Sequence, residues 1–459
     1  MNAPTPPRPV SRPEKVSLWR YMRMFRRDIL SAQPEKLYRA WMAEFRTPFF
    51  RSFLCNDPSL VRLVLQERPD DFPKSDRIRE GLAPLLGESV FVTNGAQWKR
   101  QRRIIDPAFE GGRLHETFPA MLAAGQSAVA RLEARLAAGD AKVEIEESMS
   151  HAAADVIFRT LFSIPIEHEV ASEVFAQFRA HQRTQPILNL AAFVRLPRWL
   201  PRLHRRATLR TARRIRALIT RLTRERAQEI AAGRAPDDLA TKIMTTRDPE
   251  TGQLFETGEM VDQVAIFFLA GHETSASALS WALYLLATDP QAQARAAAEA
   301  RAVAGDGAPG FADVARLKFI RNVFREALRL YPPVPMMVRE AARAECFRER
   351  AVPEGAQVVL SPWHLHRHNR IWTAPDAFDP DRWDSEETRR CARQAYIPFS
   401  AGPRVCTGAG FAMIEGVLLL ALLLRAFRFV PAPERVPVPE AHLTVRARDG
   451  IWLRLERRG

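Results

Sequence analysis

The chain has 459 residues, of which 46% are hydrophobic and 26% are charged. This composition is typical of a globular protein with a large core, and it excludes a fibrous or wholly disordered chain. Lys and Arg number 68 against 53 Asp and Glu, which gives a net charge of +15. A nucleic acid, an anionic membrane surface or an acidic protein could each bind so basic a chain, and a solvated basic surface would have the same composition.

The four cysteines, Cys55, Cys346, Cys391 and Cys406, are far apart in the sequence and form no CxxC pair. This spacing indicates neither a disulfide framework nor a zinc site, and it fits a reducing cytoplasm. Residues 1–18 are rich in proline and lack the apolar segment of a signal peptide, so we expect a disordered tail.

Helical periodicity dominates the rest of the chain, and the strand-like segments are few and short. In chain order we expect a strand at 49–55, helices at 114–138, 149–162, 207–232, 260–288, 290–304 and 319–330, and strands at 338–342, 357–360 and within 442–455. Asp289 before Pro290 predicts a helix N-cap followed by a first-turn proline.

No boundary divides the sequence, so residues 19–459 are expected to form one mainly α domain with a small β-rich lobe. Residues 370–398 are rich in Trp, Pro, Asp and Arg without a clear period, which predicts an irregular packed segment. The apolar runs at 264–270 and 417–424 are shorter than the ~18 residues that span a bilayer. We therefore expect core helices there and no transmembrane anchor.

Cys406 lies in the sequence FSAGPRVCTG, which precedes an apolar run. The run predicts a helix whose N-terminus would favour the thiolate of Cys406. Gly402 would permit a tight turn, Gly408 would leave room for a flat cofactor, and Phe399 would shield the sulfur from water. Arg404 could point toward an anion such as a propionate. A structural cysteine in a glycine-rich loop is the alternative.

A second motif, AGHETS from Ala270 onward, interrupts an apolar helix. An acid beside an alcohol at such a place is costly unless it is paired or used. Glu273 could relay protons, Thr274 could donate to the Ala270 carbonyl, and Gly271 could open a groove for a small ligand. The alternative is a helix bend with a solvated glutamate.

Two further pairs share helix faces. Glu326 and Arg329 are three residues apart, and Trp98 and Arg102 are four apart, so the latter pair could hold a carboxylate. Taken alone, the first is better explained as a surface ion pair and the second as an amphipathic basic helix.

Together, and in this order, these four motifs resemble the cytochrome P-450 family of haem-thiolate monooxygenases, and the resemblance extends over residues 19–455. It implies that Cys406 is the axial ligand of a haem b iron. It implies that Thr274 and Glu273 are the alcohol–acid pair that delivers protons during oxygen activation, beside Ala270 and Gly271. The haem-contacting loop residues would be Phe399, Gly402 and Gly408, and the propionate partners Trp98, Arg102, Arg339 and Arg404.

The resemblance also implies a structural triad of Glu326, Arg329 and Arg382. The family more often has Glu and Phe where this chain has Asp381 and Trp383 around that arginine. The implied fold is a triangular prism in which haem lies between the long central helix at 260–288 and the cysteine loop with its helix.

The implied reaction inserts one oxygen atom from O2 into a hydrophobic small molecule, such as a fatty acid, a terpenoid or a steroid-like compound. A thiolate ligand favours the O–O cleavage that this requires. Electrons would come from a separate acidic ferredoxin or flavodoxin with its reductase. A peroxide-driven relative is the alternative, and such relatives commonly lack the acid–alcohol pair. We expect a monomer that binds no nucleic acid, in the cytoplasm or at the periphery of a membrane.

Two basic segments have candidate uses. Lys99, Arg100 and Arg103 could steer the electron carrier to the proximal face. The run at 202–216 could touch a membrane or a substrate carboxylate, and a solvated helix face is the alternative. Substrate-lining positions are expected at Ala270, Gly271, 334–338, and parts of 82–92 and 185–194.

Overall fold

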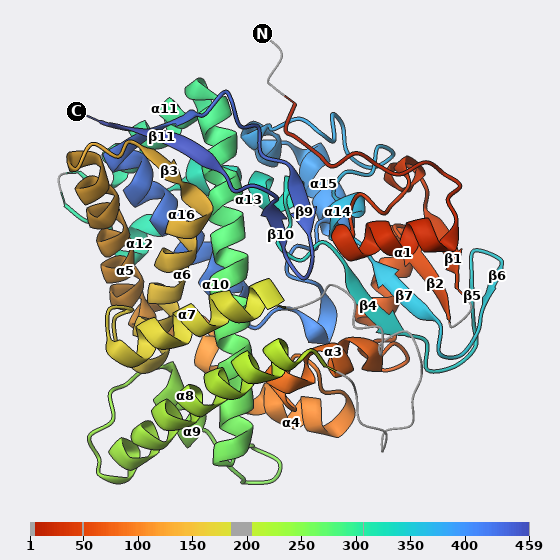
Figure 1. Cartoon of the computed structure of the whole chain (residues 1–459), viewed down its shortest axis with the longest axis horizontal. Helices are drawn as coiled ribbons and strands as arrows, with labels where there is room; N and C mark the ends of the chain where they lie inside the picture. Colours follow the sequence, from red (N-terminus) through yellow and green to blue (C-terminus); the bar gives the residue numbers. More distant parts are fainter. Residues whose placement is uncertain (1–4, 48–49, 185–203, 306, 459) are drawn as a thin grey trace.

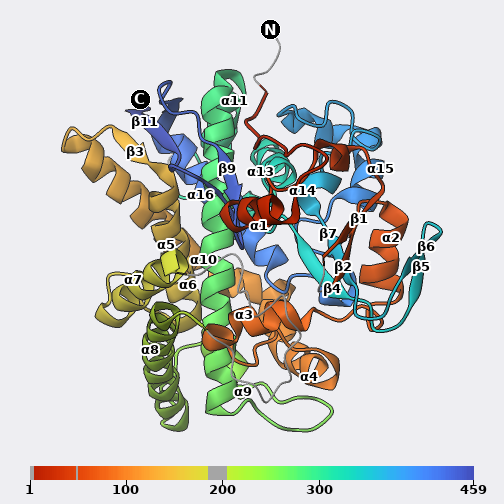
Figure 2. The same cartoon turned by 45° about the vertical axis from the view of Figure 1, so that its right-hand side comes forward.

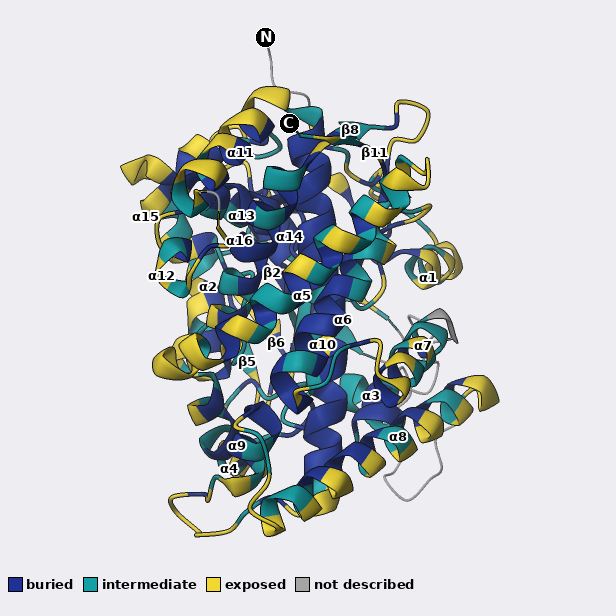
Figure 3. Ribbon diagram, turned by 90° about the vertical axis from the view of Figure 1, so that its left-hand side faces the viewer, coloured by how far each residue is buried: buried dark blue, intermediate teal, exposed yellow. Residues whose placement is uncertain are grey.

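A single long helix, α10 (Thr257–Thr288), runs through the middle of the molecule (Figure 1). The computed structural model describes residues 5–47, 50–184, 204–305 and 307–458. Helix α10 begins with a capping box in which Glu256 and Glu259 satisfy each other's backbone N–H groups. It is apolar on nearly all sides and is buried by neighbouring helices, as its dark ribbon in Figure 3 shows.

The helices beside α10 include α6 (Ile145–Phe162), α8 (Arg206–Ala231), α13 (Lys318–Leu330) and α16 (Ala409–Ala426). The others are α1 (Leu18–Arg27), α2 (Pro58–Arg62), α3 (Asp76–Leu86), α4 (Gly95–Ile105), α5 (Gly111–Ala137), α7 (Glu169–Thr184), α9 (Leu239–Thr245), α11 (Pro290–Ala304), α12 (Phe311–Val314), α14 (Pro362–Leu365) and α15 (Glu386–Ala395).

The β structure is small and consists of four sheets among the described residues. One sheet has the order β1-β2-β7-β4, and a second has the order β3-β11-β8. Two further pairs are β5 with β6 and β9 with β10. The strands are β1 (Met42–Arg46), β2 (Arg51–Cys55), β3 (Lys142–Glu144), β4 (Met337–Glu340), β5 (Glu345–Phe347), β6 (Arg350–Val352), β7 (Gln357–Leu360), β8 (Phe427–Pro431), β9 (Pro439–Ala441), β10 (Val445–Ala447) and β11 (Trp452–Arg457).

The four-stranded sheet lies across α10 from the helices α5, α7 and α8, as Figures 1 and 2 both show. Strand β2 pairs in parallel with β7, and β1 and β4 are antiparallel to their neighbours. This arrangement confirms the expected mainly α architecture with a β-rich lobe.

Most predicted elements form close to their expected bounds. Helix α11 begins at Pro290 after the Asp289 N-cap, whose side chain accepts the Ala292 N–H at 3.0 Å. The prediction of an irregular segment at 370–398 was wrong in part, because helix α15 lies within it. Helix α15 buries only Thr388 and Ala395, with Cys391 and Ala392 partly buried on the same face, and these small side chains give a weak apolar period.

Helix α16 corrects the expectation that no stretch is long enough to span a membrane. Its 18 residues have the length and apolar composition for a span. In the fold, however, it packs against α5, α10, α11 and α13, and ten of its residues are buried. Its apolar character is therefore accounted for by the core.

The N-terminal segment contacts the body of the protein from residue 7 onward. The Tyr331 hydroxyl donates to the Pro7 carbonyl at 2.7 Å, and the Arg12 Nε donates to the Ala32 carbonyl at 2.7 Å. These contacts fall within the stretch expected as a disordered tail, whose boundary at residue 18 stays a prediction.

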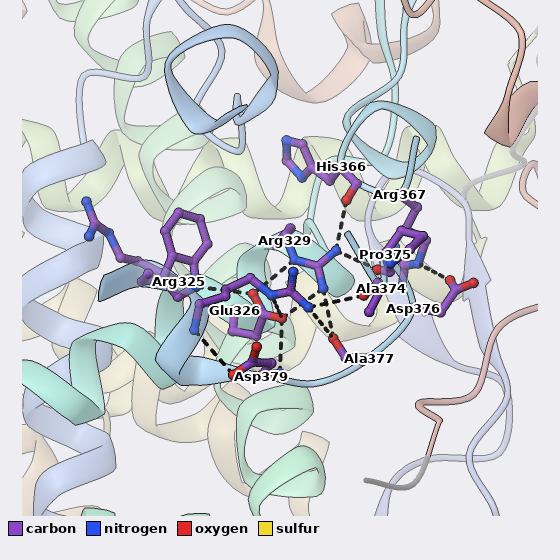
Figure 4. A network of polar contacts seen from close by, with 12 residues as sticks. Arg325, Glu326, Arg329, His366, Arg367, Ala374, Pro375, Asp376, Ala377 and Asp379 are labelled. Carbon is purple, nitrogen blue, oxygen red and sulfur yellow. Dashed lines mark hydrogen bonds and ion pairs between the residues drawn. The ribbon is translucent and has the colours of Figure 1, made fainter. Parts of the chain in front are cut away.

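The carboxylate of Glu326 on α13 is the centre of a fully buried polar network (Figure 4). Arg329 donates to both carboxylate oxygens at 2.8 and 2.9 Å, and Arg382 donates to one of them at 2.9 Å. The Trp383 indole N–H donates to the other at 3.1 Å. The triad of Glu326, Arg329 and Arg382 thus forms, and Trp383 serves it as a further donor.

Both guanidinium groups also bind backbone carbonyls of the segment that follows α14. Arg329 donates to the carbonyls of His366 at 2.9 Å and Pro375 at 2.6 Å. Arg382 donates to those of Thr373 at 2.8 Å and Ala374 at 3.1 Å. An irregular segment is thereby fixed, because side chains replace the partners that a helix or sheet would supply.

We predict that Glu326→Ala lowers the free energy of unfolding by about 3–5 kcal/mol, because it leaves two buried guanidinium groups without their carboxylate. Asp381→Ala is the matched control, since Asp381 forms an exposed ion pair with Arg295 and should cost at most ~1 kcal/mol. Urea unfolding followed by circular dichroism measures both, and equal small losses would contradict the role given to Glu326.

Candidate functional site

One stripe in the middle of α10 is left uncovered by the protein. Between residues 260 and 287, only Phe267, Ala270, Gly271 and Thr274 are not buried. Their spacing of three, four and seven residues puts them on one helix face. Three of the four are apolar, so the stripe is suited to contact a large apolar group.

Thr274 is the polar residue of this stripe. Its hydroxyl donates to the Ala270 carbonyl at 2.5 Å, the local bond expected from the sequence. A Cβ on Gly271 would lie 2.4 Å from the Ile157 Cδ1 atom, so this glycine allows α6 to pack on α10. Its predicted role in opening a groove for a ligand stays a prediction.

Glu273 is buried, and it is bound by two other parts of the chain. Its carboxylate accepts hydrogen bonds from Gln182 on α7 at 2.9 Å and from Thr444 at 2.5 Å. Arg446 on β10 forms an ion pair with the same carboxylate, with 2.5 Å between Arg446 Nη2 and Glu273 Oε1. The Arg446 side chain is 41% exposed. A solvent-exposed cation therefore contacts the buried acid directly, which excludes the alternative of a solvated glutamate.

Ser275, the next residue along α10, binds a second buried acid. Its hydroxyl donates to Glu415 Oε2 at 2.7 Å, and Glu415 Oε1 has no hydrogen-bond partner in the described structure. Burial raises the pKa of Glu415 to about 8, although the Ser275 hydrogen bond opposes this. This contact also fixes the N-terminal half of α16, which follows Cys406, beside the middle of α10.

The cysteine loop is a compact turn. The Cys406 backbone N–H donates to the Phe399 carbonyl at 2.9 Å. Gly402 has a φ of +68°, and a Cβ there would lie 2.0 Å from the Leu65 carbonyl oxygen, so only glycine fits. Space is open around the position that a Cβ on Gly408 would occupy. Phe399 packs on the edge of the main core.

The expected helix N-terminus at Cys406 needs correction. Helix α16 begins at Ala409, three residues later, and the Cys406 side chain is exposed. Desolvation by the surrounding chain raises the pKa of the Cys406 thiol, against the Gly408 N–H and the charge of Arg102, which lower it.

Four cations gather around Trp98, which is buried on α4. The Arg404 and Arg102 guanidinium carbons lie 5.2 and 5.8 Å from the ring centroid, and the Lys74 Nζ lies 5.6 Å from it. Arg339 pairs through its backbone with Lys74 across a β-bridge. Three of the predicted propionate partners, Arg102, Arg404 and Arg339, are thereby brought together with Trp98.

The four cations outnumber the acids that pair with them, which are Asp106 for Arg102 at 2.7 Å and Asp70 for Arg404 at 3.8 Å. Burial lowers the pKa of Lys74 well below its usual value, and the charges of Arg339, Arg404 and Arg102 lower it further. Burial, then Arg404, lowers the pKa of Arg339 to about 10. The Arg404 Nε has no hydrogen-bond partner in the described structure. A group with one or two carboxylates would satisfy this cluster.

Lys74 is the member of the cluster that sequence reasoning missed. Its ammonium donates to the Val90 and Thr93 carbonyls at 2.6 and 3.2 Å. It lies outside every motif, and its backbone is placed at the site by pairing with Arg339 and by hydrogen bonds with the Asn94 side chain at 3.0 Å. Arg102 joins the cluster to the cysteine loop by donating to the Val405 carbonyl at 2.8 Å.

The cations expected to receive an electron carrier are already engaged within the chain. Arg100 pairs with Glu259 at 2.7 Å, and Arg103 pairs with Asp248 at 2.6 Å and Glu250 at 3.0 Å. Lys99 pairs with Asp70 at 3.1 Å, where both side chains are mostly exposed. Of the three, Lys99 is therefore the one most accessible to a partner.

Some predicted lining positions fall outside the described residues. This applies to 185–194 and to the first two residues of the basic run at 202–216. Within the described part of that run, Arg214 pairs with Glu173 at 2.6 Å and Arg216 with Asp262 at 2.7 Å. Both arginines thus have partners in the fold.

Comparison with known protein families identifies the family of this chain. Residues 29–452 match the model of the family described as Cytochrome P450. The chain is a cytochrome P450. It is 32% identical over 397 residues to cyclooctatin synthase of Streptomyces melanosporofaciens, covering 84% of this chain and 83% of that protein.

Two further relatives are similar over comparable lengths. Cyclooctat-9-en-7-ol 5-monooxygenase of the same organism is 32% identical over 404 residues, covering 85% of this chain and 83% of that protein. Cytochrome P450 4A10 of Mus musculus is 31% identical over 423 residues, covering 87% of this chain and 80% of the relative. Family membership and these relatives make this P450 a haem-thiolate monooxygenase.

The buried carboxyl of Glu415 should make stability depend on pH. Its pKa in the folded state is raised to about 8, so the folded state keeps its proton at pH values where the unfolded chain has lost it. Stability should therefore fall as pH rises from about 5 to 8, by roughly 1.4 kcal/mol per pH unit. We predict that Glu415→Gln removes this contribution, and that the exposed Glu354→Gln does not.

Urea unfolding at a series of pH values measures the effect, as the difference in stability between each variant and the parent protein. A difference for Glu415→Gln that stays constant from pH 5 to 9 would show that Glu415 is not a buried neutral acid.

Proposed function

We propose that this P450 binds haem b through Cys406 and uses O2 to insert one oxygen atom into a hydrophobic small molecule, with electrons from a separate protein. The observation that carries the proposal is the combination of an uncovered apolar stripe on α10, an exposed cysteine in a tight loop, and a cluster of four cations that pairs with only two acids among the described residues. The stripe would contact the flat ring of a haem, the cysteine would bind its iron, and the cations would bind its propionates.

When bound, the haem supplies the oxidising chemistry, because a thiolate donor to iron favours O–O cleavage. Cys406 would hold the iron, and Lys74, Arg102, Arg339 and Arg404 would hold the propionates. Trp98 orders this cluster, because three of the four cations lie within 6 Å of its ring. Phe267, Ala270 and Gly271, on the uncovered stripe of α10, would exclude water from the reaction site.

Proton delivery is assigned to Glu273 and Thr274. Glu273 connects the exposed Arg446 to the interior of α10, so it can take a proton from the solvent side and pass it inward after a rotation of its side chain. The Thr274 hydroxyl, adjacent on the helix and on the uncovered stripe, would hold that proton beside the oxygen. This acid–alcohol arrangement favours O2 over peroxide as the oxygen source.

The substrate class follows from the apolar stripe and from the relatives. One relative is a monooxygenase named for cyclooctat-9-en-7-ol, an alkene alcohol. A terpenoid, a fatty acid or a steroid-like molecule would fit an apolar surface in which Thr274 is the polar residue. An acidic ferredoxin or flavodoxin is the proposed electron donor, because the chain carries a net charge of +15.

The cofactor assignment is tested by the spectrum of the reduced protein with carbon monoxide. We predict the red-shifted Soret band of a thiolate haem, and its loss in Cys406→Ser. Cys391→Ser is the control, because Cys391 donates to the Ile371 carbonyl away from the site and should leave the band unchanged. A Cys406→Ser protein that keeps the band would overturn the assignment.

We predict that Glu273→Gln lowers kcat about 100-fold or more, with an increased solvent isotope effect and a nearly unchanged KM. Arg446→Ala should shift the pH profile of kcat, because Arg446 positions the acid. Arg448→Ala is its matched control, since Arg448 follows the same strand but pairs with Glu440 at 2.8 Å. Steady-state kinetics with the electron donor supplied measure all three, and an unchanged isotope effect in Glu273→Gln would argue against proton relay.

A further inference from the structure

Helix α1 (Leu18–Arg27) presents an unusual outer surface to solvent. None of its residues is buried, and Trp19 is 80% exposed. The helix contains four arginines, Arg20, Arg23, Arg26 and Arg27, and no acidic residue. In Figure 3 it lies at the edge of the molecule, with much of its ribbon in the colour of exposed residues.

The inner side of α1 is firmly attached to the protein. The Tyr21 ring stacks on Phe45 of β1 with the centroids 6.4 Å apart, and Phe25 packs against the main core. The end of the helix is fixed by the buried carboxylate of Asp28, which accepts the N–H groups of Leu30 at 3.0 Å and Ala441 at 2.9 Å. The outer surface is therefore a preformed feature of the fold, and it does not have to become ordered in order to bind.

The arginines of α1 differ from most other arginines of the chain. In the described structure none of the four forms an ion pair, whereas exposed arginines such as Arg295 and Arg214 do. Trp19, Arg23 and Arg26 are spaced by four and seven residues, so they share one face of the helix. The nearest acid before the helix is Glu14, four residues from its start, and it is exposed.

We propose that this surface, made of Trp19 with Arg20, Arg23, Arg26 and Arg27, binds the anionic headgroups of a lipid bilayer and holds the enzyme at a membrane surface. Positive charge without internal partners attracts anionic lipid, at roughly fivefold in partitioning for each basic residue near the surface. An exposed indole beside these charges matches the boundary between headgroups and acyl chains, where Trp is enriched.

The exposed aliphatic residues nearby favour a membrane over nucleic acid or an acidic protein. Leu18 is 42% exposed and Val10 is 86% exposed, so two more apolar side chains accompany Trp19 in the same N-terminal segment. A phosphate backbone would use the arginines but not these apolar groups. The surface has the features of an interfacial helix that lies on the bilayer without crossing it.

Flotation of the holoprotein with lipid vesicles tests the proposal. We expect binding to phosphatidylcholine vesicles that contain phosphatidylglycerol, and little binding to phosphatidylcholine alone. The double variant Arg23→Glu with Arg26→Glu should weaken this binding about 100-fold or more, and Trp19→Ala should weaken it about tenfold. The carbon monoxide spectrum of each variant verifies that the haem site and the fold are intact.

A control with the same change in net charge separates a local surface from a general effect. The double variant Arg224→Glu with Arg234→Glu alters two exposed arginines of another region and should bind vesicles like the parent protein. Equal loss in both double variants, or no binding to anionic vesicles, would overturn the proposal. Binding of duplex DNA or an acidic protein that depends on Arg23 and Arg26 but not on Trp19, without vesicle binding, would assign the surface to that partner instead.

Discussion

The buried carboxylate of Glu326 is the constraint on which the position of the cysteine loop depends. Through Arg329 it binds the carbonyl of His366, and the His366 Nε2 accepts the Ile397 N–H at 2.9 Å. Burial, with the charge of Arg329, lowers the pKa of His366 to about 3, so the ring stays neutral and can accept this bond. Two residues after Ile397, the Phe399 carbonyl accepts the N–H of Cys406.

A chain of hydrogen bonds therefore runs from α13 to the proposed iron ligand. The arrangement explains why an acid with two guanidinium groups is retained in a buried place. A hydrophobic replacement could fill the volume, but it could not satisfy the carbonyls of a segment that has no regular structure. The same hydrogen bonds connect the network to the cysteine loop.

The excess of positive charge, which composition alone could not interpret, is used in three different ways. Some cations, including Arg100 and Arg103, form ion pairs that join α4 to neighbouring segments. A second group surrounds Trp98 and has more cations than acids among the described residues, so the carboxylates of a cofactor would complete it. A third group, on α1, forms no ion pair with any described residue.

Sequence reading was most successful where local pattern and tertiary burial agree. Helix α10 was predicted because it is a long run of apolar residues, and α11 because Asp289 and Pro290 mark its start. Helix α15 was missed because it buries only two residues, and α1 was missed although Leu18, Tyr21, Met22 and Phe25 have helical spacing. When distant segments of the chain bury a helix, the sequence of that helix does not have to show a strong apolar pattern.

The same limit applies to the site. Cys406, Thr274 and Glu326 were identified because each is part of a compact motif. Lys74 and Glu415 were not, because Lys74 reaches the site through a β-bridge and Glu415 meets its partner Ser275 from a different helix. Interactions between residues 140 or 265 positions apart have no spacing that a single sequence could reveal.

The order Glu273, Thr274, Ser275 on α10 acquires a physical meaning from these contacts. Successive residues of a helix are about 100° apart, so the three side chains point to different surroundings. Glu273 meets a solvent-exposed arginine, and Thr274 lies on the uncovered stripe. Ser275 meets a fully buried acid, Glu415, whose pKa is raised to about 8.

The acids Glu273 and Glu415 therefore have different surroundings. Arg446 forms an ion pair with Glu273, whereas burial without a cation raises the pKa of Glu415 to about 8. An acid that exchanges protons with solvent needs a contact on the solvent side, and Glu273 has one in Arg446. Glu415, with one oxygen unpartnered and no exposed neighbour in the contacts described, is better suited to fix α16 against α10 than to supply protons repeatedly.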